Sequence, residues 1–202
     1  MLALIDYRAG NLTSVRKAFA AIGADIATPQ SPADLADARG IIVPGVGHFN
    51  VTLAIDDAWR RAIRDRVAAG VPLLGICVGL QFLFEGSEEA PTLPGLGVFP
   101  GQCRLLRPTG AERLKVPHVG WNTLEQRGPS RILAGIGEAA FAYFTHSYAA
   151  PVVDGTVAAT THGAAFTSVV ERGHVFGAQF HPEKSGPVGL KLLANFVEVT
   201  RC

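Results

Sequence analysis

The sequence contains few cysteines, and their placement excludes several kinds of protein. Only three occur in 202 residues, namely Cys77, Cys103 and Cys202, an odd number at wide spacing. No cysteine lies with histidine at the spacing of a zinc site, and the sequence lacks a secretory signal. We therefore expect a cytoplasmic protein, kept in a reducing compartment, without a disulfide framework or a bound metal.

Charge and long apolar runs are also scarce. Charged residues make up 17% of the chain and the formal net charge is +1, so no basic excess is present to bind nucleic acid or a membrane surface. The apolar runs are too short to cross a bilayer. Hydrophobic residues, in contrast, make up 48%, which is enough for a large core. At this length we expect a single α/β domain over residues 1–202.

Short apolar runs alternate with helical patterns along the first half of the chain. Asn11 and Ser31 are suited to cap the helices that follow the first two strands. Strands that alternate with helices pair in parallel, and ligands collect at the carboxyl ends of such strands. Buried strands are predicted at 2–5, 24–27, 40–43 and 71–76, turn-rich strands between 92 and 121, further strands within 140–149 and 169–180, and a closing helix over 186–199.

The stretch Gly75-Ile-Cys77-Val-Gly79 lies where the fourth predicted strand gives way to a helix. A nucleophile lifted onto such a sharp turn needs small residues on either side, because the backbone is crowded there. The start of a helix also favours the thiolate form of a cysteine. Cys77 is therefore a candidate nucleophile, although a buried structural cysteine in a tight turn has the same pattern.

A cysteine nucleophile needs a histidine to move its proton and a third group to orient that histidine. Of the six histidines, His181 is the best candidate, because Pro182 and Glu183 follow it. Proline favours an extended residue before it, and in an extended chain the side chains of His181 and Glu183 point to the same side. The alternative is a strand-ending turn with two exposed polar residues.

A third part of such a site is a set of backbone N–H donors for the oxyanion of a tetrahedral intermediate. The glycine-rich segment Pro44-Gly-Val-Gly47 can present the N–H groups of Val46 and Gly47. Val78 follows the candidate nucleophile and can donate its own N–H. Taken alone, the segment at 44–47 also fits a plain turn.

Together, Gly75-Ile-Cys77-Val-Gly79-Leu-Gln81 and His181-Pro-Glu183 resemble the motifs of triad-type, class I glutamine amidotransferases. Further motifs narrow the resemblance to the glutaminase subunits of imidazole glycerol phosphate synthase, which act in histidine biosynthesis. These motifs are Ile5-Asp-Tyr-Arg-Ala-Gly-Asn11, Pro44-Gly-Val-Gly-His-Phe49, Val116-Pro-His-Val-Gly-Trp-Asn122, Tyr143-Phe-Thr-His-Ser-Tyr148 and Gln179-Phe-His-Pro-Glu-Lys-Ser185. The resemblance implies a flavodoxin-like α/β fold, a mostly parallel sheet flanked by helices with additional antiparallel strands.

The resemblance also implies a reaction. Cys77 would attack the side-chain amide of L-glutamine, His181 would protonate the leaving ammonia and then activate water, and Glu183 would orient the imidazole. No cofactor is implied. For Glu89, a solvated acidic loop is the alternative to a role in binding. Four positions match those that hold the glutamine head group in the family, namely Gln81, Glu89, Ser147 and Tyr148.

A partner is implied as well. We expect the ammonia to pass to a separate (β/α)8-barrel cyclase, in a heterodimer that makes imidazole glycerol phosphate and an aminoimidazole carboxamide ribotide. Tryptophan is common among interface hot spots, although Trp121 also fits an ordinary core position. The docking surface implied by the resemblance includes Asn11, Trp121, Tyr143 and Lys184.

One departure from the family is Arg8, where glycine is common, and we expect it to change the local loop conformation without abolishing chemistry. Three alternatives stay open. A glutaminase for another acceptor, such as pyridoxal phosphate synthase, would lack the motif at 116–121. A cysteine peptidase of similar fold would hydrolyse peptides. A non-enzymatic interaction subunit is disfavoured because all three triad residues are present.

Overall fold

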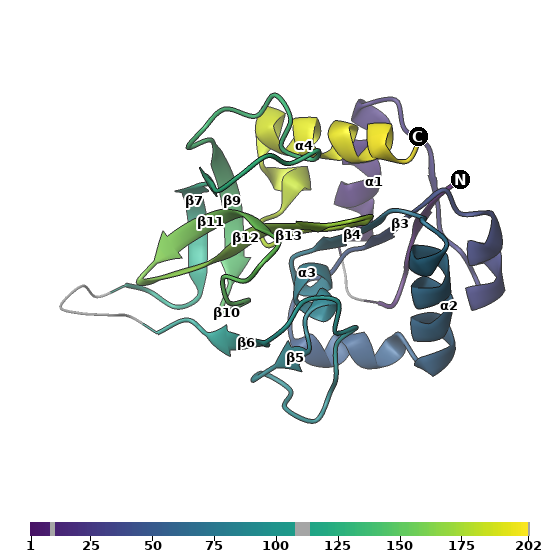
Figure 1. The fold of residues 1–202 in the computed structure, drawn as a ribbon, viewed down its shortest axis with the longest axis horizontal. Helices are drawn as coiled ribbons and strands as arrows, with labels where there is room; N and C mark the ends of the chain where they lie inside the picture. The colour runs from purple at the N-terminus through teal and green to yellow at the C-terminus, as the bar shows by residue number, and fades with distance from the viewer. Residues whose placement is uncertain (9–10, 108–113, 202) are drawn as a thin grey trace.

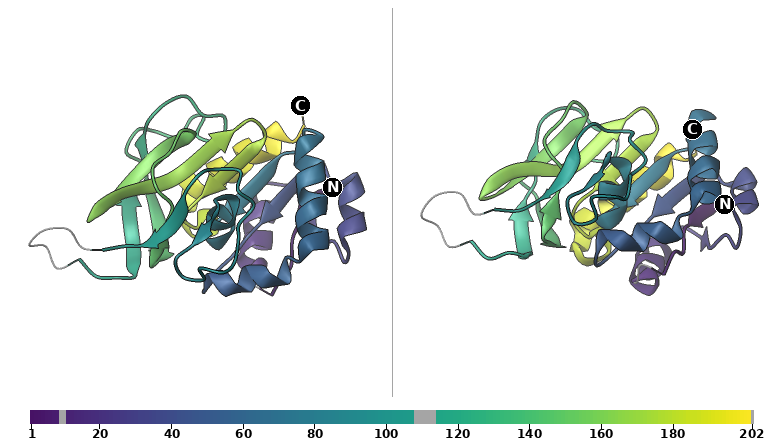
Figure 2. Two further views of the ribbon diagram at one scale, coloured as in Figure 1. Left: turned by 60° about the horizontal axis from the view of Figure 1, so that its bottom comes forward. Right: turned by 90° about the horizontal axis from the view of Figure 1, so that it is seen from below.

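The computed structural model describes residues 1–8, 11–107 and 114–201 (Figure 1). Gly10 of the first loop motif, the predicted turn residues Pro108 and Gly110, and Cys202 lie outside these residues. The described chain forms a central sheet with helices on both faces and two smaller sheets beside it (Figures 1 and 2). This arrangement confirms the expected α/β class.

The central sheet contains eight strands in the order β2-β1-β3-β4-β13-β12-β11-β8. Strands β2, β1, β3, β4 and β13 run parallel, and β12, β11 and β8 extend the sheet through antiparallel pairs. The predicted mixture of parallel and added antiparallel strands is therefore confirmed. The bounds are β1 Leu2–Leu4, β2 Ile26–Ala27, β3 Gly40–Val43, β4 Leu73–Ile76, β8 Glu125–Gln126, β11 Thr156–His162, β12 Ala164–Arg172 and β13 Val175–Ala178.

Helices cover both faces of this sheet (Figure 1). On one face lie α1 (Leu12–Ala21) and α4 (Gly186–Val199), and α4 has the bounds predicted for the closing helix. On the other face lie α2 (Asp57–Ala68) and α3 (Val78–Leu83). Because both faces are covered, every residue of β1, β3 and β4 is buried, which explains why these strands are short apolar runs in the sequence.

Three short 3₁₀ helices complete the connections, η1 (Pro32–Asp37), η2 (Phe49–Ala54) and η3 (Pro182–Lys184). The helix predicted after Ser31 is η1. Its first turn is closed by the carboxylate of Asp34, which accepts hydrogen bonds from the backbone N–H groups of Gln30 at 2.8 Å and Ser31 at 3.0 Å. The predicted start is therefore confirmed, in a tighter helix than the usual α form.

Two smaller sheets lie beside the antiparallel half of the central sheet (Figure 2). The strands β7 (His118–Thr123) and β9 (Phe141–His146) pair as an antiparallel ribbon. The strands β10 (Tyr148–Ala149), β6 (Gln102–Leu105) and β5 (Gly86–Ser87) form the other. Ser147 alone separates β9 from β10, so both sheets meet at this residue.

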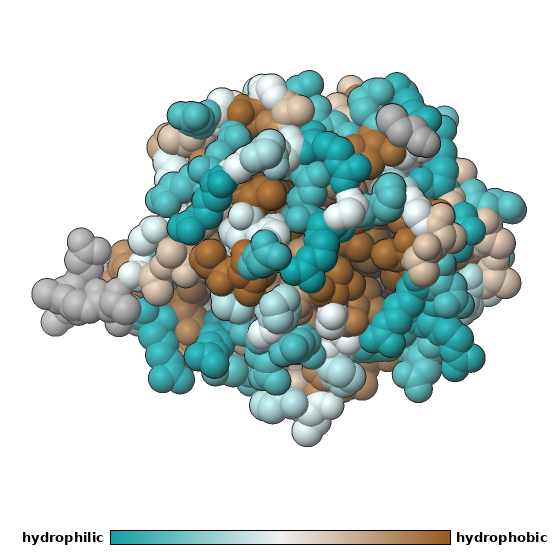
Figure 3. Space-filling view, in the orientation of Figure 1, coloured by the Kyte–Doolittle hydropathy of each residue, from teal (hydrophilic) through white to brown (hydrophobic). Residues whose placement is uncertain are grey.

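The core is rich in large apolar side chains, whereas the face in Figure 3 is hydrophilic at its edges with apolar residues gathered near its middle. No helix among the described residues is long and apolar enough to cross a membrane. The largest of the fully buried side chains are phenylalanines, namely Phe19, Phe49, Phe82, Phe84, Phe99, Phe144, Phe176, Phe180 and Phe196.

Candidate active site

Cys77 occupies a sharp turn between β4 and α3. Its backbone has φ 54° and ψ −105°, a conformation that a non-glycine residue rarely adopts. A Cβ on Gly75 would lie 2.4 Å from the carbonyl oxygen of Gly79, and a Cβ on Gly79 would lie 1.8 Å from that of Val43. Both positions must therefore be glycine for the turn to form, and the predicted strand–turn–helix around Cys77 is confirmed.

His181 and Glu183 meet next to this turn. The His181 Nδ1 lies 2.9 Å from the Glu183 Oε1, and each side chain is only 1% exposed, which rules out a turn with two exposed polar residues. The contact was predicted from an extended chain, and that part is wrong. His181 is extended, but Pro182 begins η3, because proline suits the first position of a helical turn. The side chains meet across this turn.

The charge of His181 depends on its neighbours. Burial lowers the pKa of His181, but the nearby Cys77 sulfur and the Glu183 carboxylate together raise that pKa to about 10. The His181 Nε2 is buried, and no hydrogen bond of ordinary geometry joins it to another of the described residues. The site therefore favours an imidazolium at His181, beside the Cys77 sulfur and the Glu183 carboxylate.

Asn11 holds the outer end of this arrangement, and this corrects its predicted role as a helix cap. Asn11 has φ 62° and its side chain makes no capping hydrogen bond to α1. Its amide Nδ2 instead donates to the Glu183 Oε1. A buried carboxylate needs donors more than an exposed helix end does, because water can solvate the latter. Asn11 thus ties the start of α1 to the acid of the triad.

A small cavity opens over the Cys77 sulfur. Its volume is about 30 Å³, which is room for a water molecule or two and not for glutamine. All four positions expected to hold glutamine contribute to its wall, together with the nucleophile. The lining residues are Gly47, Cys77, Val78, Gln81, Glu89, Thr145, His146, Ser147 and Tyr148.

The adjacent carboxylates of Glu88 and Glu89 bind different parts of the chain. The Glu89 Oε2 accepts a hydrogen bond of 2.7 Å from the backbone N–H of Phe49, which follows the segment at 44–47. Glu88 instead accepts from the backbone N–H of Leu105 at 3.3 Å and lies 3.8 Å from Arg104. Glu89 is therefore part of the site and not merely a solvated acidic residue.

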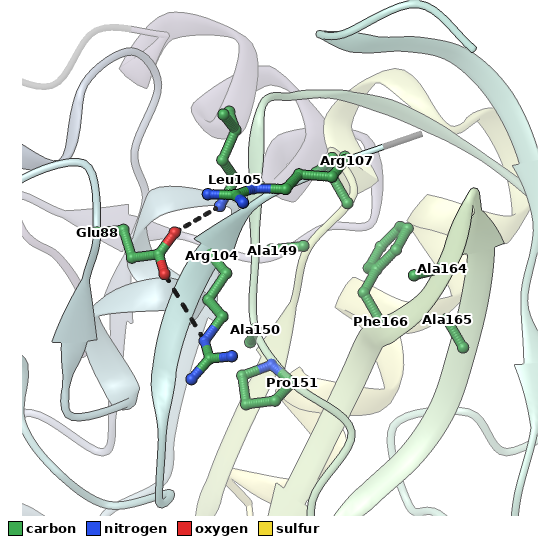
Figure 4. Close-up of a pocket in the computed structure, with 11 residues that line it drawn as sticks. Glu88, Arg104, Leu105, Arg107, Ala149, Ala150, Pro151, Ala164, Ala165 and Phe166 are labelled. Carbon is green, nitrogen blue, oxygen red and sulfur yellow. Dashed lines mark hydrogen bonds and ion pairs between the residues drawn. The ribbon is translucent and has the colours of Figure 1, made fainter. Parts of the chain in front are cut away.

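Glu88 borders a second cavity of about 380 Å³, shown in Figure 4. Glu88, Arg104 and Leu105 lie on one side of it and Phe166 on the other. None of the triad residues lines this larger cavity. Size alone therefore does not locate the reaction centre, which is identified by the chemistry around the smaller cavity.

The candidate oxyanion segment is anchored at one end. The Tyr7 hydroxyl donates to the carbonyl of Pro44, and Gly47 has φ 89°. Burial, and then the charge of Cys77, raise the pKa of Tyr7, so the phenol stays protonated as this donor. Tyr7 was not singled out in the sequence analysis, since a tyrosine beside a strand is an ordinary core residue there. Arg8 has φ 61°, the left-handed region that glycine adopts easily, which fits its place in the family pattern.

Gln179 is a second residue that the sequence analysis did not assign. Its Nε2 donates toward the Cys77 sulfur at 3.7 Å, and its Oε1 accepts from the Gln81 Nε2 at 3.4 Å. It lies two residues before His181 in a motif already quoted, which was the only signal in the sequence. Gln179 thus joins the nucleophile to a wall of the cavity.

Three of the four predicted docking residues form one surface cluster. The rings of Trp121 and Tyr143 lie 6.1 Å apart, and the Lys184 Nζ lies 5.8 Å from the centre of the Tyr143 ring. Trp121 is 56% exposed, so it is not a core residue. Val119 and Phe141, also more than half exposed, extend this surface along the β7–β9 ribbon. Asn11 is half-buried and bonded to Glu183, the residue before Lys184.

Metal chemistry has no built site in the described chain. Within residues 1–8, 11–107 and 114–201, no group of three histidine, cysteine, aspartate or glutamate side chains is placed to hold an ion. Cys77 and Cys103 are both free and buried. The thiol of Cys77 beside the buried His181–Glu183 pair can support nucleophilic attack by sulfur with proton transfer by His181.

Known structures share this fold. The crystal structure of a glutamine amidotransferase superposes on this chain with a TM-score of 0.75 and 19% sequence identity. The superposition covers 99% of each chain. The structure of PurLQS from Thermotoga maritima covers 98% of this chain and 97% of that chain, with a TM-score of 0.73 and 17% identity. At these identities the likeness establishes the fold alone.

Several sequence relatives have a much higher sequence identity to this chain than these structures have. The imidazole glycerol phosphate synthase subunit HisH of Deinococcus radiodurans is 49% identical over 199 residues, covering 96% of this chain and 91% of the relative. HisH of Salinibacter ruber is 44% identical over 205 residues, covering 97% and 93%. The family model for glutamine amidotransferase class-I matches residues 3–199. The chain therefore belongs to the class-I glutamine amidotransferases and, within them, to the HisH family.

Proposed function

We propose that Cys77, His181 and Glu183 hydrolyse the side-chain amide of L-glutamine. The observation that carries this proposal is the meeting of a thiol on a strained turn with a buried imidazole–carboxylate pair, over a cavity walled by polar groups. The Cys77 sulfur attacks the amide carbon, and His181 gives its proton to the leaving amine, so ammonia departs and a thioester remains. His181 then takes a proton from water, which attacks the thioester and releases glutamate.

Glutamine binding is assigned to the cavity wall. Gln81 and Glu89 offer an amide and a carboxylate, and Ser147 and Tyr148 offer main-chain groups at the junction of β9 and β10. A carboxylate suits the α-amino group of the amino acid, and N–H groups suit its carboxylate. The cavity must widen before the substrate enters, because it now holds only a water molecule or two.

The oxyanion of the tetrahedral intermediate is assigned to the backbone N–H groups of Val46, Gly47 and Val78. Val78 follows the nucleophile at the start of α3, and Gly47 lines the same cavity. Gly47 has a positive φ, which glycine adopts without a steric penalty and other residues rarely adopt. The peptide between Val46 and Gly47 can therefore change its orientation. We infer that this peptide turns its donor into the site when the partner and its ligand bind.

As a member of the HisH family, the chain is the glutamine amidotransferase subunit of imidazole glycerol phosphate synthase and serves histidine biosynthesis. The ammonia passes to a separate (β/α)8-barrel cyclase subunit, which makes imidazole glycerol phosphate and the aminoimidazole carboxamide ribotide. The cluster of Trp121, Tyr143 and Lys184 is assigned as the docking surface. Asn11, bonded to Glu183, would carry the effect of docking to the triad. The free thiols among the described residues suit the reducing cytoplasm. The family match over residues 3–199 supports a single domain.

The test of the nucleophile uses the complex of the chain with its cyclase. Cys77→Ala should abolish glutamine-dependent product formation and leave the reaction with added ammonium unchanged. Cys103→Ala is the matched control, because Cys103 is also buried and free but does not line the cavity. Residual glutamine-dependent turnover in Cys77→Ala would remove Cys77 from its role.

The test of gating compares glutamate release by the chain alone, with the cyclase, and with the cyclase and its ligand. We expect the chain alone to be nearly inactive, because the cavity holds only a water molecule or two and has to widen before glutamine enters. Full turnover by the isolated chain would contradict the gating and leave the triad assignment intact.

A further inference from the structure

Three histidines outside the triad gather beside the substrate cavity. They come from three strands, His118 from β7, His146 from β9 and His162 from β11. The ring of His118 stacks on that of His162, with centroids 4.1 Å apart, and lies edge-on to that of His146 at 5.2 Å. His118 and His146 are only 4% and 7% exposed, and His146 lines the cavity over Cys77. The proposed mechanism leaves these buried polar side chains without a role.

The hydrogen bonds of Asn122 fix the proton on His118. The Asn122 Oδ1 accepts from the backbone N–H of Thr123 at 2.8 Å, and its Nδ2 donates to the Thr161 carbonyl at 3.0 Å. These two backbone partners settle which end of the amide is the donor. The same Nδ2 lies 3.3 Å from the His118 Nε2, which must accept and so carries no proton. A neutral His118 is therefore protonated on Nδ1.

The hydrogen bonds of His146 assign its proton to Nδ1 as well. The His146 Nδ1 lies 2.9 Å from the carbonyl oxygen of Tyr148, which can only accept, so this Nδ1 carries the proton. The His146 Nε2 is then an acceptor, and the His118 Nδ1, 3.2 Å away, is its donor. Two independent ends, an amide and a carbonyl, thus assign Nδ1–H to both rings.

Neither ring can take up a proton without breaking this order. A proton on the His118 Nε2 would face the Asn122 Nδ2, and a proton on the His146 Nε2 would face the His118 Nδ1, so two donors would meet. Burial, and then His162, lower the pKa of His118 to about 4. Burial and then His118 lower the pKa of His146 to about 3, with His181 and His162 acting in the same direction and the bond to Tyr148 opposing them.

The bonds join two surfaces with different tasks. Asn122 follows Trp121 on β7, and Trp121 is an exposed member of the docking cluster. At the other end, the Tyr148 carbonyl also accepts from the Gln81 Nε2 at 2.8 Å, and both Tyr148 and Gln81 line the cavity. His146 and Gln81 together therefore fix the peptide between Tyr148 and Ala149, which directly follows the Ser147–Tyr148 main chain.

We propose that Asn122, His118 and His146 form a one-directional hydrogen-bond relay, which holds the Ser147–Tyr148 main chain in the geometry that binds glutamine. His118 and His146 are positioning residues in this scheme, since they act through the Tyr148 carbonyl. The assignment of glutamine to this main chain rests on the proposed function, whereas the direction of the relay rests on the hydrogen bonds alone.

The direction of the relay is tested by ¹⁵N NMR of the histidine rings in the full chain, with each signal assigned by single histidine variants. We expect His118 and His146 as neutral Nδ1–H tautomers from pH 7.5 down to about 5. His162 is an internal contrast, because its Nε2 donates to the Lys115 carbonyl at 2.9 Å and should carry the proton. An Nε2–H tautomer or a cation at His118 or His146 in this range would overturn the relay.

The positioning role is tested by two variants in the complex with the cyclase. His118→Leu removes the donor to the His146 Nε2 and should raise KM for glutamine about tenfold, with kcat within about twofold. His118→Asn can place its Nδ2 where the His118 Nδ1 lies and should keep KM near the wild-type value. A wild-type KM in His118→Leu, or equal damage in both variants, would overturn the positioning role. A complex that hydrolyses no glutamine while its rings are Nδ1–H would contradict the proposed function and leave the relay standing.

Discussion

The two halves of the central sheet build their share of the site in different ways. In the parallel half, β4 and the turn after it fix Cys77 through main-chain geometry, because Gly75 and Gly79 leave no space for a side chain. Beside the antiparallel half, the β7–β9 ribbon fixes its share through side-chain hydrogen bonds, from Asn122 through His118 to His146. The nucleophile is thus held by backbone packing, and the substrate wall by a network of polar groups.

The difference predicts how each half tolerates change. A backbone clash cannot be relieved by rotating a side chain, so the parallel half should fail abruptly. A side-chain network can lose one bond at a time, so the antiparallel region should fail in steps and respond to pH. The His181–Glu183 pair lies between these two regions, because it follows β13, which pairs with β4 on one edge and with β12 on the other.

The largest effect is expected from Gly79→Ala. The new Cβ would lie 1.8 Å from the Val43 carbonyl oxygen, so the turn and the adjacent strand must separate. We expect a loss of about 3 kcal/mol or more in the free energy of unfolding, together with the loss of glutaminase activity, measured by denaturant unfolding and glutamate release. Gly128→Ala, where a Cβ would meet nothing within 4 Å, is the control and should be nearly neutral. Wild-type stability in Gly79→Ala would break the comparison.

The second largest effect is expected from Glu183→Gln, which removes the carboxylate bonded to His181. The pKa of His181 should fall, because the carboxylate that helps to raise it is gone. We expect kcat/KM for glutamine to drop about a thousandfold, with the fold retained, in steady-state assays of the complex. Glu88→Gln changes the neighbouring carboxylate that borders the other cavity and should leave the rate unchanged. Similar rates for both variants would refute the role of Glu183.

The β7–β9 ribbon, which carries His118 and His146, should lose stability in acid. The folded-state pKa values of His118, about 4, and His146, about 3, lie below their ordinary value of 6.5, so between these values the unfolded chain binds protons that the folded chain does not. Their stabilising contribution is therefore complete above pH 6.5 and lost as the pH falls toward 4. We expect the free energy of unfolding to decrease by several kcal/mol over this window, because each ring contributes about 1.4 kcal/mol per pH unit between its unfolded and folded pKa values. The measurement is urea unfolding at each pH.

A double variant, His118→Leu with His146→Leu, should lose most of this pH dependence. His174→Gln removes an exposed histidine and should retain it. Equal pH dependence in the wild type and the double variant would show that other groups are responsible.

The smallest effect is expected from Trp121→Ala on the exposed face of the ribbon. Trp121 is 56% exposed, so its loss should leave the free energy of unfolding within about 0.5 kcal/mol of the wild type. Binding of the cyclase should weaken by about 2 kcal/mol, measured by calorimetric titration. Val152→Ala, another exposed apolar residue away from the ribbon, should not change binding. An unchanged affinity in Trp121→Ala would move the docking surface elsewhere.

The sequence alone predicted the parallel half well, because buried strands and crowded turns leave strong local patterns. The strands at 2–5, 40–43 and 71–76 and the helix at 186–199 all appear, and so does the turn around Cys77. The long strand β11 was not predicted, since Thr156–His162 mixes threonine and alanine without clear alternation. Local pattern identifies an element best when both of its faces are buried.

The polar network could not be predicted in the same way. Asn11 looked like a helix cap, and only the fold shows that Glu183, 172 positions later, takes its side chain instead. His118 and His146 were noticed in dense motifs, but their partnership depends on the pairing of β7 with β9 in one register, which places His118 opposite His146. Contacts of this kind are set by the assembly of distant segments, and no local propensity encodes them.

The pairing of β4 with β13 fixes more than the sheet. Ile76 stands opposite Ala178, and the Cys77 N–H donates to the Ala178 carbonyl at 2.8 Å. The sulfur and the imidazole therefore come just after the ends of two neighbouring strands whose register is fixed by hydrogen bonds. Sliding one strand by a single residue would displace the reacting atoms by about 3.3 Å and reverse the facing of every side chain. Control over turnover therefore falls to groups around the reactive pair that can move while the strand register stays fixed, such as the Gly47 peptide and the Asn11 side chain.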